Sequence, residues 1–336
     1  MAVQRTIASA LVFLALAAVA CGGSDSSKAA ATPSTGAPAK AIVKPQVVTT
    51  VSPITSIAAN VVGDLADVRG VIPEGADSHT FEPPPGTAAV LSKADVVFVN
   101  GLKLEDPTKE LAQSNLKAGA EMVELGTRTI TPDRYIYDFS FPKEGGKPNP
   151  HLWTNPPYAK DYARIVAETM ERRDAEHADG YKANYAKFAA RVDELDTAMK
   201  AATATVPKRE LLTYHDAYAY FGLHYGWTIL GAIQVSSFED PTPKEVAALI
   251  KQVKTEKVPA IFGSEVFPSP VLAQIGKEAG VRYVDQLRDD DLPGEPGDPG
   301  HSWLGLMRLD YITMVKNLGG DASALEAVTV VDTAPD

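Results

Sequence analysis

The fold is decided by the stretch from Asp179 to Val206, which reads DGYKANYAKFAARVDELDTAMKAATATV. Its apolar residues recur alternately four and three positions apart, which is the spacing of one face of an α-helix. These residues are Tyr181, Tyr185, Phe188, Val192, Leu195, Met199, Ala202 and Val206. At about 1.5 Å per residue the helix would span on the order of 40 Å. The heptad-like pattern ends with this stretch, so we expect a strut between two lobes rather than a coiled coil.

Length and composition fit a protein of two ordinary domains. The chain has 336 residues, of which 45% are hydrophobic and 22% are charged, enough for two separate cores. The net charge of −11 argues against a nucleic-acid partner, which would require clustered lysine and arginine. The only cysteine is Cys21, so the sequence excludes an internal disulfide.

The first 44 residues indicate export and anchoring. Arg5 precedes an apolar run from Ile7 to Val19 that is too short to span a bilayer, and small residues then lead to Cys21. Residues 1–21 therefore resemble a bacterial lipoprotein signal, with Cys21 as the lipid-modified first residue of the mature chain. The alternative is an ordinary secretory signal with a stray cysteine. Residues 22–44 are rich in small and polar residues and predict a flexible tether. We expect an extracytoplasmic protein held at the membrane by lipid.

The remainder predicts an α/β fold of two lobes. In residues 45–177 and 207–320, short β-rich runs alternate with helical patterns, as in mostly parallel sheets flanked by helices. The expected strands are Val47–Val51, Val68–Pro73, Asp95–Asn100, Glu121–Leu125, Arg209–Tyr214, Trp227–Ile233, Pro259–Phe262 and Val281–Val284. Residues 178–206 form the connecting helix, a closing helix runs from about Ser302 to Leu318, and residues 321–336 are expected to be a loose tail.

Three histidines occupy loops where such folds bind ligands. His79 and His215 follow predicted strands, and His151 precedes a predicted helix that Asn155 would cap. Taken singly, His79 has a plainer interpretation as a surface residue, and His151 as a residue that caps a helix or packs beside Trp153. Taken together, they predict a cation site in the cleft between the lobes, because imidazole nitrogens with one carboxylate suit Zn²⁺. Mn²⁺ would favour more oxygen ligands.

Carboxylates lie in the same loops. Glu82 and Asp216 are close enough in sequence to His79 and His215 to orient an imidazole. Asp216 is also a candidate helix cap. Glu265 follows a predicted strand. Three consecutive acids, Asp289, Asp290 and Asp291, follow another, and a nearby cation would relieve their mutual repulsion. The plainer interpretation of the triplet is a solvated turn.

Four segments together resemble one known family. They are Gly75–Glu82 (GADSHTFE), Asn100–Glu105 (NGLKLE), Asn149–Pro156 (NPHLWTNP) and His215–Phe221 (HDAYAYF). In this order around a long helix they are similar to the zinc/manganese solute-binding lipoproteins of bacterial ABC importers. The family pattern departs at Ser78, where proline is usual, and at Asn149, where aspartate is common.

The resemblance implies specific roles. His79, His151 and His215 would be metal ligands. The fourth ligand would be Asp290, with Asp289 and Asp291 as neighbouring alternatives, and Glu82, Asp216 and Glu265 would lie just behind the ligands.

The resemblance also implies a function. The protein would be a monomer, not an enzyme, that captures zinc, or alternatively manganese, between its lobes and delivers it to an ABC importer permease. The rival interpretations are a secreted zinc hydrolase with Glu82 or Glu265 as base, and an anchored adhesin with a structural metal. The chain has no His-Glu-x-x-His pair, and a fourth protein ligand would close the position that hydrolysis needs.

Overall fold

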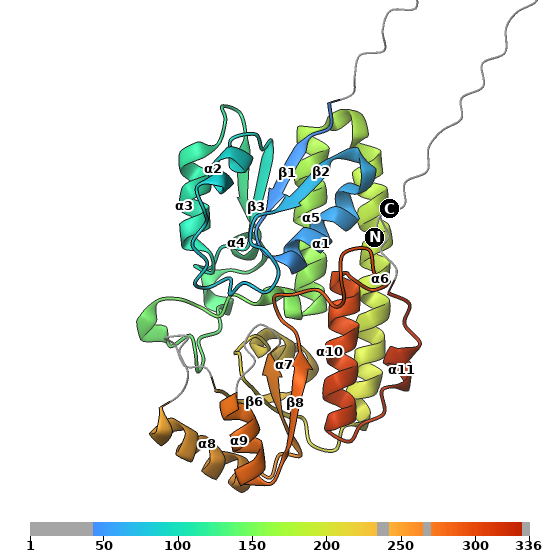
Figure 1. Cartoon of the computed structure of the whole chain (residues 1–336). Coiled ribbons are helices and arrows are strands. Elements are labelled where there is room, and N and C mark those ends of the chain that lie inside the picture. Colours follow the sequence, from blue (N-terminus) through green and yellow to red (C-terminus); the bar gives the residue numbers. More distant parts are fainter. Residues whose placement is uncertain (1–42, 234–241, 265–269, 331–336) are drawn as a thin grey trace, which may run out of the picture. The chain divides into compact units, whose positions relative to one another are not determined.

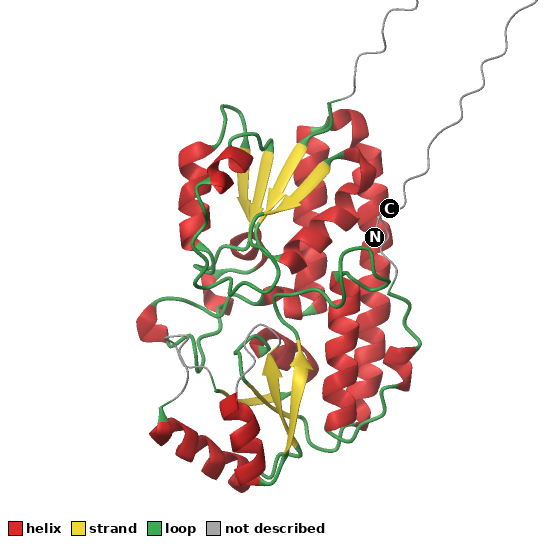
Figure 2. Ribbon diagram, viewed as in Figure 1, coloured by secondary structure: helices red, strands yellow, loops and turns green. Residues whose placement is uncertain are grey.

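The computed structural model describes residues 43–233, 242–264 and 270–330. Within them, two parallel four-stranded sheets are each flanked by helices and are joined by one long helix (Figure 1, Figure 2). This arrangement confirms the predicted fold class. The predicted signal and all of the tether except Val43 and Lys44 lie outside the described residues, and so do Cys21 and Glu265. None of the described helices is long and apolar enough to cross a membrane.

The first sheet has the strand order β2-β1-β3-β4, with every neighbouring pair parallel. Its strands are β1 (Gln46–Thr49), β2 (Asp67–Gly70), β3 (Val96–Val99) and β4 (Glu121–Glu124). The helices between and after them are α1 (Ser52–Val62), α2 (Gly86–Leu91), α3 (Asp106–Asn115) and α4 (Leu125–Thr129). All four residues of β3 are buried, as expected for a central strand covered on both faces.

The second sheet repeats this design with the order β6-β5-β7-β8. Its strands are β5 (Glu210–Thr213), β6 (Thr228–Ala232), β7 (Ala260–Ser264) and β8 (Arg282–Leu287). Its helices are α7 (Ala219–Tyr225), α8 (Pro243–Glu256), α9 (Pro270–Ala279) and α10 (Trp303–Asn317). Short 3-10 turns lie at Gly63–Leu65, Pro132–Arg134, Lys143–Gly145, Leu152–Thr154 and Ala175–His177.

Two long helices, α5 (Pro156–Arg173) and α6 (Ala178–Thr205), pack against each other beside the sheets (Figure 1). The 28-residue α6 contacts α1 of the first lobe and α10 of the second. The apolar face predicted for it is buried except at Tyr185, which is half-buried. Residues of both sheets, among them Val96 and Phe262, belong to one continuous hydrophobic core. The strut is therefore packed into the core along its length.

Three local expectations differ from the structure. Asn155 occupies the predicted N-cap position of α5, but its side chain makes no cap hydrogen bond, and its amide donates to the Tyr220 carbonyl at 3.1 Å. The segment after His215 becomes helical only at Ala219. The end of the chain is not loose throughout, since α11 (Ser323–Glu326) packs against α6 and buries Leu325 completely. The Arg308 guanidinium holds this turn by donating to the Leu325 carbonyl at 2.9 Å.

Candidate metal centre

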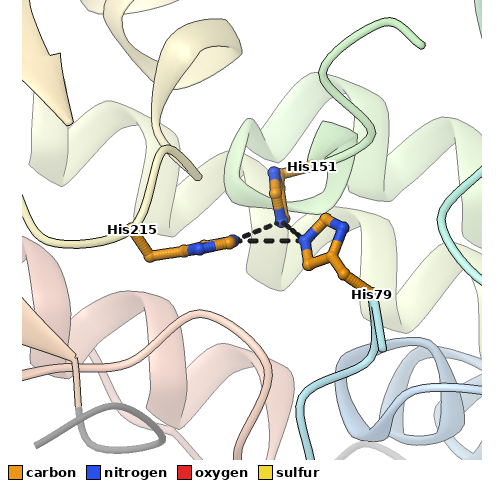
Figure 3. A group of neighbouring side chains, drawn as sticks. All are labelled: His79, His151 and His215. Atoms are coloured by element: carbon orange, nitrogen blue, oxygen red, sulfur yellow. Dashed lines mark hydrogen bonds between the residues drawn. The ribbon is translucent and has the colours of Figure 1, made fainter. Parts of the chain in front are cut away.

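The three loop histidines point their Nε2 atoms at a common point (Figure 3). The Nε2–Nε2 distances are 3.1 Å between His79 and His151, 3.3 Å between His79 and His215, and 3.0 Å between His151 and His215. Three nitrogens bound tetrahedrally at about 2.0–2.1 Å from Zn²⁺ would be roughly 3.3 Å apart. The rings are therefore already close to the spacing that one shared cation requires.

Loop contacts orient the His151 ring and shape the loop that carries His79. His151 has its Nδ1 atom 2.9 Å from the Asn149 Oδ1 atom, and its backbone N–H donates to the same oxygen at 3.1 Å. An amide oxygen only accepts, so Nδ1 of His151 carries the hydrogen and Nε2 presents its lone pair. The Asn149 amide in turn donates to the Asp216 carbonyl at 2.7 Å. The His79 loop is turned by a bond from its backbone N–H to Asp77 Oδ1 at 2.9 Å.

Burial sets the charge of the imidazoles. His151 and His215 are buried, and His79 is partly buried. Burial lowers the pKa of His79 and of His151 well below the usual value, and the neighbouring His215 lowers it further. Both rings are therefore neutral at neutral pH, which is the form that binds metals.

Two acids of the triplet reach the histidines. The Asp289 Oδ2 atom lies 3.6 Å from His215 Nε2. Asp289 and Asp290 also group with His151, with one ligand atom of each within 4.8 Å of the others. Among the described residues, Asp289 Oδ2 and Asp290 Oδ1 are buried without a hydrogen-bond partner. Asp291 is turned away, because both its oxygens accept from the Gly75 N–H at 2.9 and 2.8 Å.

Burial makes the ionised form of Asp289 and of Asp290 unfavourable. Burial raises the pKa of Asp290 to about 8, and the charge of Asp289 adds to this effect. Burial also raises the pKa of Asp289, while His215 opposes the rise. The other oxygen of each carboxylate accepts a bond from a hydroxyl group. Ser78 donates to Asp290 Oδ2, and Ser264 donates to Asp289 Oδ1 at 3.2 Å. A cation beside the unpartnered oxygens would offset this unfavourable burial.

The other predicted carboxylates lie differently. Glu82 is exposed to solvent. Asp216 is fully buried, and its carboxylate accepts a bond from the Ser140 N–H at 3.1 Å. Its side chain therefore ties down the loop before His151. Glu265 lies outside the described residues.

Sequence reasoning missed several supporting residues. Trp153 donates from its indole N–H to the Asp289 carbonyl at 2.8 Å, and Trp303 donates to the Trp153 carbonyl at 3.0 Å. Asp310 of α10, fully buried, accepts from the Arg288 N–H at 3.0 Å just before the acidic triplet. These partners are more than 20 residues apart in the chain. Their residue types carry no local signal of the pairing, so only the fold brings them together.

Two parallel sheets sharing one long helix, with loops of both lobes converging on one buried cluster, define a two-lobed solute-binding protein. The chain belongs to the ZnuA family, described as the periplasmic component A of the zinc-uptake complex, whose profile matches residues 47–317.

Similar proteins have different metals in their names. The iron-binding protein YfeA of Yersinia pestis is 27% identical over 284 residues, covering 84% of this chain and 89% of YfeA. The manganese ABC transporter substrate-binding lipoprotein PsaA of Streptococcus pneumoniae is 25% identical over 277 residues, covering 82% and 89%. The solved structure of the periplasmic zinc-binding protein TroA of Treponema pallidum has the same fold, with a TM-score of 0.73 and 24% identity over 82% of this chain and 99% of TroA.

Proposed function

We propose that this protein captures a divalent transition metal between its lobes, outside the cytoplasm, and hands it to the permease of an ABC importer. The observation that carries the proposal is the convergence of three imidazole Nε2 atoms within 3.3 Å of one another. Membership of the ZnuA family supports the transport role. We infer no turnover of the bound species, so the protein acts as a carrier and not as an enzyme.

The proposed ligands are His79, His151 and His215 with one oxygen of the Asp289–Asp290 pair. Asp290 is the ligand that the family resemblance favours. The approach of Asp289 Oδ2 to His215 Nε2, at 3.6 Å, makes Asp289 an equal candidate. Three nitrogens and one oxygen in a buried site favour zinc over the harder manganese ion. Relatives named for manganese and iron make these two ions the alternatives to compare.

The test is metal content, measured by mass spectrometry on protein purified without added metal. The variants are His79→Ala, His151→Ala and His215→Ala. Structural zinc sites bind with about 10–16 kcal/mol shared among four ligands, so losing one is expected to weaken binding by roughly 100-fold or more. His177→Ala is the matched control, because His177 pairs with Asp174 at 2.8 Å near the start of α6. Unchanged metal content in all three site variants would remove the proposal. Zinc, manganese and iron(II) titrations then rank the cargo.

The attachment of the protein to the membrane is a proposal separate from that of metal binding. Cys21, as the lipid-modified residue, would hold the protein at the cell membrane, with residues 22–44 as tether and the protein acting as a monomer. Replacement of Cys21 by alanine is expected to move the protein from the membrane fraction to the soluble fraction. Retention of the variant in the membrane fraction would contradict this attachment.

A further inference from the structure

A cavity opens beside the histidine cluster. Its volume is about 290 Å³, far more than the roughly 15 Å³ that one water molecule needs. His79 is one of its lining residues, and the others come from two loops: the turn after β3, and the connection that leads to His151. The lining residues are His79, Leu102, Lys103, Ser140, Phe141, Pro142, Gly145, Lys147, Pro148 and Pro150. We call this space the lysine cavity, because each of the two loops contributes one lysine to it.

The lysine cavity carries the same sign of charge as the metal ion that the protein is proposed to bind. Lys103 and Lys147 are exposed side chains that line it, and none of the described residues that line it is acidic. Within the described part of the chain, neither lysine is paired with a carboxylate in an ion pair. The chain as a whole carries a net charge of −11, so two cationic groups beside a cation site are not a consequence of composition. A bare divalent ion approaching His79 through this space would be repelled.

Lys103 lies in a turn whose backbone conformation is unfavourable for residues with side chains. Gly101, Leu102 and Lys103 have φ values of 76°, 54° and 64°, a left-handed conformation that is unfavourable for the two residues with side chains. The buried carboxylate of Glu105 secures this turn by accepting from the Asn100 N–H at 2.6 Å and the Gly101 N–H at 3.2 Å. Strained backbone that the surroundings hold in place is commonly associated with function. Here the turn brings Lys103 to the cavity.

We propose that the lysine cavity receives a small polycarboxylate anion that arrives chelated to the metal. This inference rests on the proposed metal-binding function. The metal end of the complex would face His79, the least buried of the three histidines, and the carboxylate end would face Lys103 and Lys147. The histidine Nε2 atoms and one aspartate oxygen then replace the carboxylate oxygens on the metal. The freed anion leaves through the cavity, and the metal does not change its oxidation state.

The test compares loading rates from three zinc sources at equal total zinc. The sources are the aquo ion, the neutral bis-glycinate complex and the anionic citrate complex, and loading is followed by stopped-flow fluorescence of the tryptophans. The test variant is Lys103→Gln/Lys147→Gln. The matched control is Lys182→Gln/Lys187→Gln, which removes the same charge from exposed positions of α6.

The double variant in the cavity is expected to load at least tenfold more slowly from zinc citrate, the lower end of the range for charge-steered association. Its rates from the aquo ion and the glycinate complex should be unchanged or higher. The difference should shrink as ionic strength rises. The control variant should match the unmodified protein with all three sources.

Equal citrate rates in the cavity variant and the unmodified protein would overturn the inference, as would an equal slowing from all three sources. The equilibrium zinc stoichiometry separates this from failure of the proposed function. If one zinc binds per chain but the lysines have no effect on the citrate rate, only the cavity inference fails. If no source loads zinc into the unmodified protein, the metal-binding proposal fails.

Discussion

Glu105 provides the sharpest test of how the site's scaffold is built. Its side chain is only 2% exposed. One carboxylate oxygen accepts from the Thr50 hydroxyl at 2.8 Å and from the Asn100 N–H at 2.6 Å, and the other accepts from the Gly101 N–H at 3.2 Å. Burial nevertheless dominates these bonds and raises the pKa of Glu105 from 4.5 to about 7. The perturbation is Glu105→Gln, which keeps the shape and removes the charge.

The raised pKa of Glu105 sets the direction and the size of the expected change in stability with pH. Between pH 4.5 and 7 the folded protein holds a proton that the unfolded chain has released, so the free energy of unfolding falls as pH rises. The difference of about 2.5 in pKa corresponds to about 3 kcal/mol at 1.36 kcal/mol per pH unit. Glutamine does not titrate, so its contribution to stability does not depend on pH. Its NH₂ group would face the Gly101 N–H and lower the free energy of unfolding by about 1–2 kcal/mol at every pH. The stability advantage of the unmodified protein over the variant should therefore shrink by about 3 kcal/mol between pH 4.5 and pH 7.5.

The assay is urea denaturation of both proteins, followed by circular dichroism, at several pH values with a chelator present. Comparing differences between the two proteins cancels the titration of every other group. Glu110→Gln, an exposed position in α3, is the control and should give a gap independent of pH. A constant gap for Glu105→Gln would refute the claim that burial of this carboxylate costs stability at neutral pH.

Three further predictions concern the metal. Asp289→Asn and Asp290→Asn should weaken zinc binding to different extents, as measured by competition titration. Loss of the true ligand should weaken binding by roughly 100-fold or more. Loss of its neighbour should weaken binding by about 10–100-fold. Equal and negligible effects would exclude both acids. Metal loading should change the fluorescence of Trp153, whose ring lies 5.1 Å from that of His151; Trp153→Phe should remove most of the change, whereas Trp227→Phe should not. Zinc at 100 times its Kd should stabilise the fold by about 2.7 kcal/mol, seen as a higher Tm that a chelator reverses and that His151→Ala lacks.

Much of the fold could be predicted because its determinants are local. The apolar period of α6 identified the strut to within a residue at each end. The strand patterns found both sheets because each strand follows or precedes a helix with its own turn residues. His79 and His215 could be selected because ligands bind on the loops that follow the strands of such sheets. His151 could be selected because it precedes the predicted helix that becomes α5. Tyr185 belongs to the predicted apolar face but is half-buried, because the helical spacing puts it at the edge of that face.

The remaining features depend on contacts that no local pattern encodes. Ser78 and Asp290 are 212 positions apart, and their hydrogen bond exists only because both lobes have formed. The same holds for the Trp153 indole and the Asp289 carbonyl, which are 136 positions apart. Asn155 has the residue type and position of a helix cap, but its side-chain oxygen makes no cap hydrogen bond, while its amide donates to the Tyr220 carbonyl of α7. Within a run of three aspartates, the sequence cannot say which side chains turn inward, because neighbouring residues differ only in backbone direction.

The hydrophobic core shared by both lobes determines how the protein unfolds. Buried residues of the first sheet, such as Phe98, and of the second, such as Leu211, share one cluster with the inward face of α6. Neither lobe retains a complete interior without the other, so excised halves are expected to remain unfolded. Heating should give one cooperative calorimetric transition, and cleavage within α6 should abolish both lobes at once.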